Sequence, residues 1–390
     1  MDSTSVVGAG EPAATRAGPI SVQLIESAAD IPLSATAWNA LVSHNETNSV
    51  FQTHEWFEAW WRTFGSGHRL FFLLLRTGGE PVGFVALMLR RQLLGGPRLE
   101  FVGTGNADYQ DFVLLPEHKE AAMVAICGFL HEHAASWRSA WLCNVPSQSS
   151  TLTHLRRIGV AHQLHLVDEA VMRCPSLQLQ SEGREAERLL KKYSLKRPQN
   201  WFAAHGEVRF RHLSSEGEIR SMLPVFFDQH VRRYREAGRA SLFETPRQQA
   251  FYRALATALH SGGWLLFSVV EFNGRPIAFH FGFDYFGGIT WYKPSFEVEY
   301  AEHSPGLLLM RKLIEDGVAR SRREMDFTIG DEPFKDRFAN MSRFNVTVSM
   351  YHSLSNAWGA RAWLLARRSA GGVARQFRRL RSTATAFAFR

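Results

Sequence analysis

The sequence predicts a mixed α/β protein with two similar domains in tandem, each built on a mostly antiparallel sheet flanked by helices. Apolar, β-prone runs alternate with segments of helical periodicity from residue 20 to about residue 352. In addition, residues 70–87 align without a gap with residues 265–282, at an offset of 195 positions. Each aligned segment has two apolar runs joined by a glycine-containing turn, and hairpins can share such turn residues by chance. Because another strand, a helix and a strand follow each segment in the same order, we expect an internal duplication. A chain of 390 residues, 45% of them hydrophobic, is long enough for two such domains.

The first half is expected to contain a helix between its first strand and a long apolar hairpin. Thr53 is a suitable N-cap for this helix, because its hydroxyl can accept a hydrogen bond from a first-turn N–H. Glu55 and Arg62 suit the positive and negative ends of the helix dipole. The other elements are expected to be strands at 20–26, 69–77, 82–91, 98–103 and 139–145, and helices at about 117–135 and 149–158.

The second half is expected to repeat this order after a charged, helical stretch at about 182–262. Pro198 should break that stretch, because proline lacks the N–H that a helix interior needs. The predicted elements that follow are strands at 263–272, 277–285 and 287–296, a helix at 304–321 and a strand at 325–329.

The two ends of the chain differ in composition from its body. The first 19 residues are small and polar and lack the pattern of a signal peptide, so we expect a disordered arm. Residues 358–390 contain eight arginines and no acid, and without them 37 basic residues balance 37 acidic ones. A neutral body disfavours nucleic-acid binding. We therefore divide the chain into an arm (1–19), a first domain (20–180), a second domain (181–352) and a basic tail (353–390).

Cysteine usage and hydropathy predict a cytoplasmic protein. Cys127, Cys143 and Cys174 are far apart and form no CxxC pair, which disfavours a disulfide framework or a metal site. No apolar run approaches the about 20 residues that a membrane span needs. The tail mixes arginine with Trp, Leu and Phe, so it could lie on an anionic membrane surface, or it could be a mobile or packing segment.

The motifs of several enzyme classes are absent, namely GxSxG, the P-loop and HExxH. A more informative segment is the start of the helix at 304–321. Ser304 can cap this helix and Pro305 suits its first position. Gly306 has no side chain, so an anionic ligand could approach the exposed backbone N–H groups closely. The alternative is an ordinary capped helix that packs through its apolar face, including Leu307.

The stretch Met325–Phe338 starts as an apolar strand, breaks at Gly330 and continues with charged residues. It follows the helix, so its loop lies at the C-terminal end of a strand, where ligand sites of α/β sheets gather. Lys335 could hold a phosphate or carboxylate, and Asp331 or Glu332 could accept a proton. The alternative is a solvated turn with local ion pairs.

His280 is a further candidate, because alternation along its strand places it on the face opposite Phe279 and Phe281. It could act as a general base, or it could be a structural histidine with satisfied hydrogen bonds.

At this point a family resemblance becomes visible. Residues 222–345 resemble the acetyltransferase domain of the GNAT superfamily found in CelD-type, BioF-like proteins of bacterial cellulose and exopolysaccharide loci. The shared pattern is Asp-Phe-x-x-Gly-x-x-x-[Tyr/Phe]-Lys, present here as DFTIGDEPFK, together with the Ser-Pro-Gly helix start. Two segments of the first half also resemble the family, SVFQTHEWFEAWW (49–61) and GNADYQDFVL (105–114), so the resemblance covers about residues 20–352.

The resemblance implies tandem GNAT-like folds, distantly related to the Fem-type aminoacyl transferases. It implies acetyl-CoA or another acyl-CoA as co-substrate, with the donor at Ser304, Gly306, Leu307 and Gly330. The usual pyrophosphate signature of the superfamily is not intact here, because EHSPGL offers a single glycine. An aminoacyl-tRNA or another activated acyl donor therefore remains open.

These observations predict an acyltransferase that acts on an amine or hydroxyl of a sugar or cell-envelope precursor, with catalysis by His280, Asp331, Glu332 and Lys335. Two alternatives remain. One is aminoacyl transfer of the Fem type, and the other is a non-catalytic scaffold of a polysaccharide machine. The expected location is the cytoplasm, or the inner surface of the membrane if the tail binds lipid.

Overall fold

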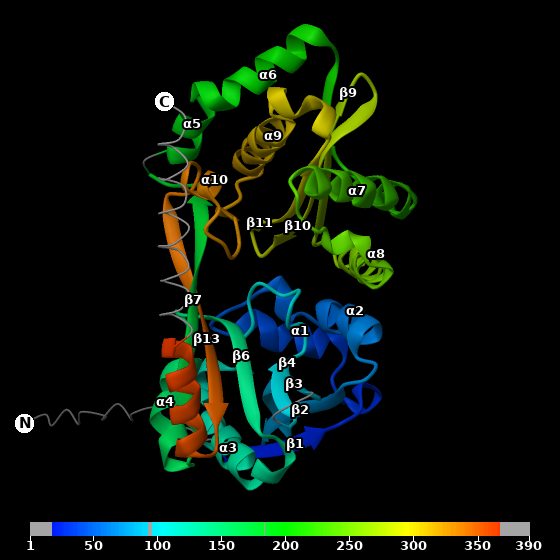
Figure 1. Ribbon diagram of the computed structural model, residues 1–390. Coiled ribbons are helices and arrows are strands. Elements are labelled where there is room, and N and C mark those ends of the chain that lie inside the picture. The colour runs from blue at the N-terminus through cyan, green and yellow to red at the C-terminus, as the bar shows by residue number, and fades with distance from the viewer. Residues whose placement is uncertain (1–17, 93–95, 183, 367–390) are drawn as a thin grey trace, which may run out of the picture.

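The computed structural model describes residues 18–92, 96–182 and 184–366. Its strands join into a single sheet of 13 strands that runs through both halves of the molecule, with helices on its faces (Figure 1). The strand order is β1-β2-β3-β4-β6-β13-β7-β12-β11-β10-β9-β8, and β5 pairs separately with β3. The predicted mixed α/β class is therefore confirmed.

Strands and helices are interspersed along the described residues. The first half contains β1 (Ser21–Ile25), α1 (Ala35–His44), α2 (His54–Phe64), β2 (Arg69–Thr77), β3 (Glu80–Arg90), β4 (Arg98–Phe101), β5 (Val113–Leu114), α3 (Lys119–Glu132), β6 (Ser139–Pro146), α4 (Thr151–Ala161) and β7 (His165–Gln178). The second half contains α5 (Glu185–Leu190), α6 (Tyr193–His205), β8 (Val208–His212), α7 (Glu216–Glu236), α8 (Pro246–Ser261), β9 (Leu265–Phe272), β10 (Arg275–Tyr285), β11 (Gly288–Phe296), α9 (Pro305–Ala319), β12 (Glu324–Asp326), α10 (Pro333–Asp336) and β13 (Met341–Tyr351). A C-terminal helix follows over 354–366.

The duplicated hairpins have the same local geometry. Both turns place two successive residues at positive φ, Gly78 and Gly79 in one and Asn273 and Gly274 in the other, which is typical of the two-residue I′ turn. Each hairpin then has a one-residue bulge, at Val82 in the first and at Ile277, 195 residues later, in the second. The two hairpins thus share their turn geometry, and they also share a bulge that the sequence alignment did not predict.

In each half a parallel strand pair opens after three residues. β4 pairs with β6 only as far as Glu100 and Trp141. β11 pairs with β12 only as far as Thr290 and Asp326. Beyond these points the partner strands separate, and the gap in the second half lies beside the site described below.

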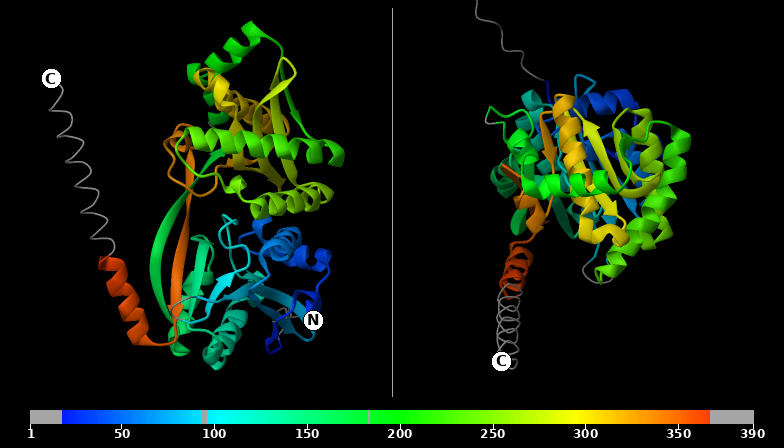
Figure 2. Two further views of the ribbon diagram at one scale, coloured as in Figure 1. Left: turned by 45° about the vertical axis from the view of Figure 1, so that its right-hand side comes forward. Right: turned by 90° about the horizontal axis from the view of Figure 1, so that it is seen from above.

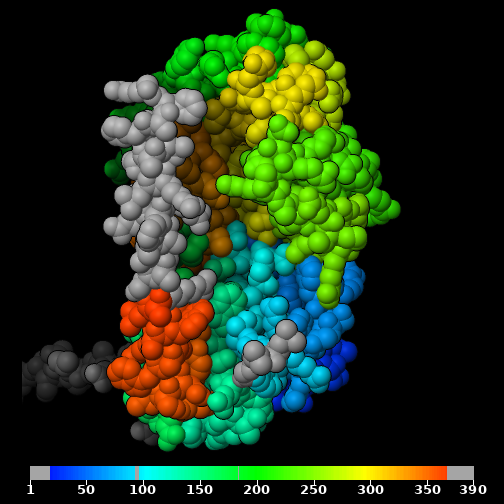
Figure 3. Space-filling model, viewed as in Figure 1, coloured from blue at the N-terminus to red at the C-terminus, as the bar shows by residue number. Residues whose placement is uncertain are grey.

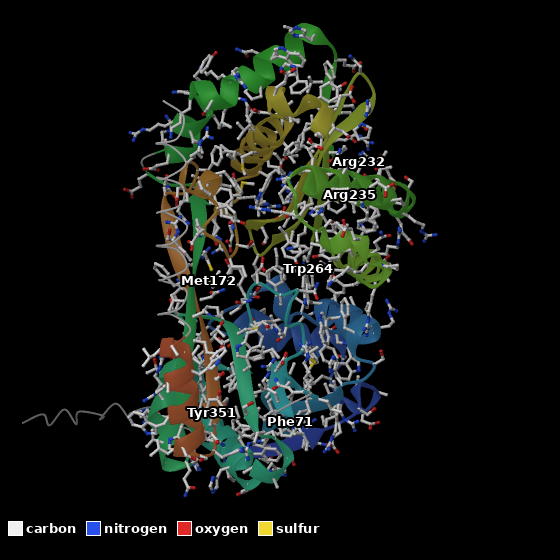
Figure 4. All side chains as sticks on the ribbon, viewed as in Figure 1. Phe71, Met172, Arg232, Arg235, Trp264 and Tyr351 are labelled. Carbon is white, nitrogen blue, oxygen red and sulfur yellow. The ribbon has the colours of Figure 1, made fainter. Side chains whose placement is uncertain are left out.

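The two halves exchange their last strands. β7 is the last strand of the first half in sequence, but it pairs with β12 of the second half. β13 is the last strand of the second half, but it pairs with β6 of the first half. The two strands also pair with each other from Met341–Ser176 to Tyr351–His165. Figure 2 shows them side by side between the halves, and Figure 4 shows Met172 of β7 at this crossing and Tyr351 of β13 within the first half. The division into domains at residue 180 stays a prediction.

Three apolar clusters form the core, and one of them belongs to both halves. This shared cluster joins aromatic side chains of α1 and α2 to those of α7, α8 and the β9–β10 hairpin, among them Trp38, Trp56, Phe226, Phe251 and Phe283. Trp264 packs against it at the junction of the halves (Figure 4). Each of the other two clusters is centred on one half, and the exchanged strands add Val348 and Met350 of β13 to the first and Leu177 of β7 to the second.

Two sequence expectations are wrong in detail. Pro198 lies inside α6, which continues through it, because the burial of Leu195 and Phe202 offsets the one hydrogen bond that proline removes. The strand expected at 325–329 ends at Asp326, because Thr328 has a φ of 58° that a strand does not accommodate.

Candidate active site

A cavity of about 650 Å³ lies between the halves, beside the paired segment of β11 and β12. Both halves contribute to its walls, with Phe51 and Tyr109 from the first and Tyr285, Thr290, Asp326 and Arg343 from the strands of the second and of β13. The site is therefore complete only when the two halves are assembled.

Asp326 is one of three acids that line this cavity, with Glu46 and Glu324. Its Oδ1 accepts hydrogen bonds from the Tyr109 hydroxyl at 2.9 Å and from the Thr328 backbone N–H at 2.8 Å. Burial raises the pKa of Asp326 to about 6, although Arg343, whose Nη2 lies 3.6 Å from Oδ2, opposes the shift. A carboxylate whose pKa lies near the working pH is suited to take up and return a proton.

Tyr109 comes from the loop that follows β4 in the first half. This loop is fixed against the second half, because the Tyr292 hydroxyl donates to the Asn106 carbonyl at 2.5 Å and the Asn106 side chain donates to Gln248 at 2.9 Å. Burial raises the pKa of Tyr109, and the neighbouring Asp326 raises it further. Tyr109 therefore stays protonated and donates its hydrogen bond to Asp326 across the interface.

Arg343 at the start of β13 completes this group. Its guanidinium donates to both carboxylate oxygens of Glu324, at 3.2 and 2.7 Å. The pair holds Arg343 beside Asp326 and leaves the cavity with one acid of raised pKa next to a fixed cation. The three strands β11, β12 and β13 thus position the polar wall of the site.

The loop after β12 is closed by Lys335, which sequence analysis proposed as a site residue. Its ammonium donates to the Ile329 carbonyl at 2.7 Å and pairs with Glu332 at 2.9 Å, and the side chain is 5% exposed. Gly330 has a φ of 134°, and a Cβ there would lie 2.9 Å from the Lys335 ammonium and closer still to Glu332. The absence of a side chain at Gly330 thus leaves room for the Lys335 ammonium, and the contacts of Lys335 stabilise the loop.

The proposed acids of this loop face solvent. Asp331 is 76% exposed and lies 3.7 Å from Arg173, and Glu332 is occupied with Lys335. None of these three residues lines the cavity at Asp326. Their catalytic roles stay predictions.

Behind the cavity lies a second polar group that joins the two halves. Burial raises the pKa of Asp108, a first-half residue, although Lys293 of β11 lowers it. Burial likewise lowers the pKa of Lys293, and Asp108 opposes this. Lys335 acts on both residues from the loop, so the motif lysine belongs to this buried charge network.

His280 lies on the face of the sheet opposite Phe279 and Phe281, as predicted. Its ring stacks on Trp291 at 5.0 Å, and Nε2 lies 3.2 Å from the Thr290 carbonyl. Burial lowers its pKa to about 3, so the imidazole is neutral near pH 7. His280 does not line the cavity at Asp326, and its role as a base stays a prediction.

The predicted donor site at the start of α9 differs from expectation in one respect. Ser304 does not cap the helix with its side chain, because its backbone is left-handed and its carbonyl accepts from the Leu307 N–H instead. Pro305 occupies the first position as expected. A Cβ on Gly306 would lie 3.2 Å from the Phe296 ring, so packing alone already restricts this position. The residues 304, 306 and 307 are all partly exposed.

The first half has no acid at the position equivalent to Asp326. The third residue pair of the parallel β4–β6 ladder is Glu100–Trp141, and the third pair of the β11–β12 ladder is Thr290–Asp326. Trp141 therefore takes the position that Asp326 has in the second half. The Trp141 indole donates to Glu169 at 3.0 Å, so a different contact occupies the equivalent place. The duplication has therefore left the acid at this position in one half only.

Sequence reasoning missed Asp326 and Tyr109, although both lie in stretches that carried the family resemblance. Asp326 is the first residue of the quoted Asp-Phe pattern, and Tyr109 lies in GNADYQDFVL. An acid placed directly after an apolar strand residue was the available signal. Its pairing with a tyrosine 217 positions earlier was not readable.

Comparison with known proteins supports the fold. Residues 191–336 match the family described as the acetyltransferase (GNAT) domain. No curated protein matches the sequence. The second half therefore has the GNAT-type acyltransferase fold.

Similar solved structures cover nearly the whole chain. FemX is 10% identical, with a TM-score of 0.61, over 84% of this chain and 98% of that one. A conserved protein of unknown function from Bacteroides thetaiotaomicron is 9% identical, with a TM-score of 0.52, over 85% and 100%. The C-terminal domain of a candidate lysylphosphatidylglycerol synthetase from Agrobacterium fabrum is 13% identical, with a TM-score of 0.50, over 85% and 96%. At these identities the likeness shows the fold alone.

Proposed function

We propose that the protein is an acyltransferase that moves an acyl group from acyl-coenzyme A to an amine or hydroxyl of a saccharide or cell-envelope precursor. The observation that carries the proposal is Asp326, a carboxyl group with a pKa of about 6 that lines a cavity between the halves of a GNAT-type fold. Such a group matches the need of acyl transfer, in which the attacking amine or hydroxyl must lose a proton.

The residues of the cavity have separate tasks in this reaction. Ionised Asp326 would accept the proton of the acceptor as that group bonds to the acyl carbon. The C–S bond of the thioester would break, and coenzyme A would leave as the thiol with the proton that Asp326 returns. Tyr109 holds Oδ1 in place by its hydrogen bond, and Arg343 keeps the carboxylate ionised at neutral pH. The acceptor lies in the cavity, where Phe51 and Tyr285 offer apolar faces for a sugar ring beside the polar wall.

The start of α9 fits the anionic part of the donor. Pro305 has no N–H and the Leu307 N–H donates to the Ser304 carbonyl, so Gly306 is the first-turn residue that can offer its N–H to an anion. Residues 304–307 include three that are partly exposed. Acyl-coenzyme A would supply an activated thioester there. β11 runs into this helix through the short 3₁₀ segment Val298–His303, while β12 ends at Asp326. A donor bound at the start of α9 would then lie, like Asp326, on the side of the parallel strand pair where both strands end.

Two alternatives share this fold. FemX has a similar architecture, so aminoacyl transfer is the second enzymatic candidate. The resemblance of the motifs to CelD-type proteins favours a saccharide acceptor, and a non-catalytic role in the same machinery is the third candidate. These alternatives differ from the proposal in whether coenzyme A binds.

Calorimetric titration of the full chain with coenzyme A tests the proposal. We expect binding by the wild type and loss of binding in Gly306→Trp, because an indole would cover the first-turn N–H groups. Gly217→Trp is the matched control, since Gly217 is also the second residue of a helix and has open space around its Cα. It should bind as the wild type does.

Circular dichroism should show that both variants fold. Binding by neither the wild type nor the control would contradict acyl-coenzyme A as the donor and would favour the alternatives.

A further inference from the structure

The C-terminal helix over 354–366 carries an apolar outer surface. It packs on the first half through Ala357, which is 3% exposed, with Ala360 and Leu364 partly buried (Figure 3). On its outer side Leu354 is 56% exposed and Trp358 is 60% exposed. These two residues line a groove of about 260 Å³ against α4, together with the 66% exposed Val160. We call Val160, Leu354 and Trp358 the tail-helix patch.

Arginines border this patch. Arg156 and Arg361 line the same groove, and the Arg361 guanidinium lies 5.8 Å from the centre of the Trp358 ring. The groove also contains His165 and Asp168, and Asp168 pairs with Arg156 at 2.8 Å. Arg361 donates to the Leu166 carbonyl and forms no ion pair with an acid among the described residues. The surface thus combines exposed Trp and Leu side chains with cationic groups.

The sequence continues this character beyond the described residues. No acid follows Asp336, and residues 337–390 contain ten arginines. Residues 1–357 contain 37 basic and 37 acidic side chains, so the excess of positive charge belongs to residues 358–390. The positive charge therefore lies at the same end of the chain as the tail-helix patch.

We propose that the tail-helix patch docks on an anionic lipid bilayer. Trp358 and Leu354 would enter the boundary between headgroups and acyl chains, and the arginines would lie among lipid phosphates. The described helices include none that is long and apolar enough to cross a bilayer, so the helix would lie on the surface. A single amphipathic helix with a basic segment supplies the two signals that stable attachment needs.

A second copy of the chain is a poorer occupant of this surface. In a two-fold contact the patch would meet itself. Arg156 and Arg361 of the two copies would then approach each other, and Asp168, the only acid among the described residues of the groove, is already paired with Arg156. Anionic headgroups, in contrast, complement this charge.

Vesicle sedimentation of the full chain tests the proposal. We expect the protein to sediment with vesicles that contain phosphatidylglycerol and to remain in solution with vesicles of phosphatidylcholine alone. Arg361→Gln should weaken binding about fivefold. Trp358→Glu should weaken it about tenfold or more, because the variant loses apolar area and gains a charge that anionic lipid repels.

Val124→Ser is the matched control, since Val124 is an exposed apolar residue on α3, away from the patch, and its loss should leave binding unchanged. Binding should also weaken at about 1 M salt, where the screening length falls to about 3 Å. Equal binding to both vesicle types, or equal binding by Trp358→Glu and the wild type, would overturn the proposal. Concentration-dependent dimers that Trp358→Glu abolishes, without vesicle binding, would overturn it in favour of self-association.

Discussion

Asp326 links the chemistry of the cavity to the stability of the fold. Its pKa of about 6 exceeds the ordinary value of 3.8, so the folded state holds the proton more tightly than the unfolded chain does. The stability contribution of the protonated group is therefore present below pH 4 and is lost as the pH rises through 6. Relative to Asp326→Asn, the wild type should lose up to about 3 kcal/mol over this window. Urea unfolding across the pH range measures this difference.

The same variant should be impaired in transfer, because an amide does not accept the acceptor's proton. We expect kcat to fall by about 10²–10⁴-fold. Asp168→Asn, which changes an exposed acid of the first half, serves as control and should alter neither activity nor the pH dependence of stability. An Asp326→Asn enzyme of normal kcat would show that another group takes the proton.

Tyr109 should tune this acid from the other half of the molecule. Its hydrogen bond lowers the pKa of Asp326, so Tyr109→Phe should raise that pKa. The acid limb of kcat/KM against pH should then move upward by about one unit, as expected for a lost hydrogen bond to a charged group. Tyr193→Phe, at an exposed tyrosine of α6, should leave the profile in place. A fall in kcat without a shifted limb would mean that Tyr109 acts in another way.

At the residue scale, the sequence indicated the right stretches but not the residues that line the cavity. Lys335 and Asp326 lie nine positions apart in one motif, and both are polar residues beside apolar ones. Only the backbone turn at Gly330 folds Lys335 onto the Ile329 carbonyl and leaves Asp326 at the cavity. Burial of this kind depends on the path of the loop, which residue types alone do not specify.

At the element scale, the conformation of the loop after β12 depends on a single glycine, Gly330. A side chain there would meet Lys335 and Glu332, and a φ of 134° is unfavourable for any residue with a Cβ. Gly330→Ala should therefore destabilise the protein by about 2 kcal/mol, through backbone strain and displacement of the Lys335 contacts. Urea unfolding measures this loss.

Gly217→Ala is the control for this prediction, because Gly217 has open space and lies in the first turn of α7. Alanine should be neutral or slightly stabilising there. An equal effect of both substitutions would show that the loop does not depend on the glycine.

The elements that sequence reasoning found are those with local signals. The hairpins were predictable because a two-residue turn with glycine lies between long apolar runs. β7 and β13 were missed, because β7 contains Asp168, Glu169 and Pro175 and lacks a clean apolar alternation. Both strands are specified by pairing with each other and with distant partners, and such pairing leaves little trace in a local pattern.

At the scale of the whole molecule, the exchange of β7 and β13 makes the two halves interdependent. The fold class followed from the duplication, but the exchange did not, since tandem domains with separate sheets would show the same repeat in sequence. The cavity of the candidate active site is a direct result of the assembly. It draws Tyr109 from one half and Asp326 from the other, and β13 brings Arg343 to both.

This interdependence predicts that the protein unfolds as one unit. A first half alone would leave β6 without β13 and β7 without β12, which exposes unpaired strand edges. The shared aromatic cluster would be cut as well. Differential scanning calorimetry should therefore show a single transition whose calorimetric and van't Hoff enthalpies agree.

A matched pair of core variants makes this prediction specific. Leu73→Ala removes a buried side chain from the cluster of the first half, and Leu313→Ala does so in the second. Each should cost about 2–5 kcal/mol and lower the same single transition, because neither half can unfold without exposing the strands it shares. If the halves were independent, each variant would move one of two transitions and leave the other in place. Loss of acyl transfer should then coincide with the single transition, because the cavity exists only while both halves are folded.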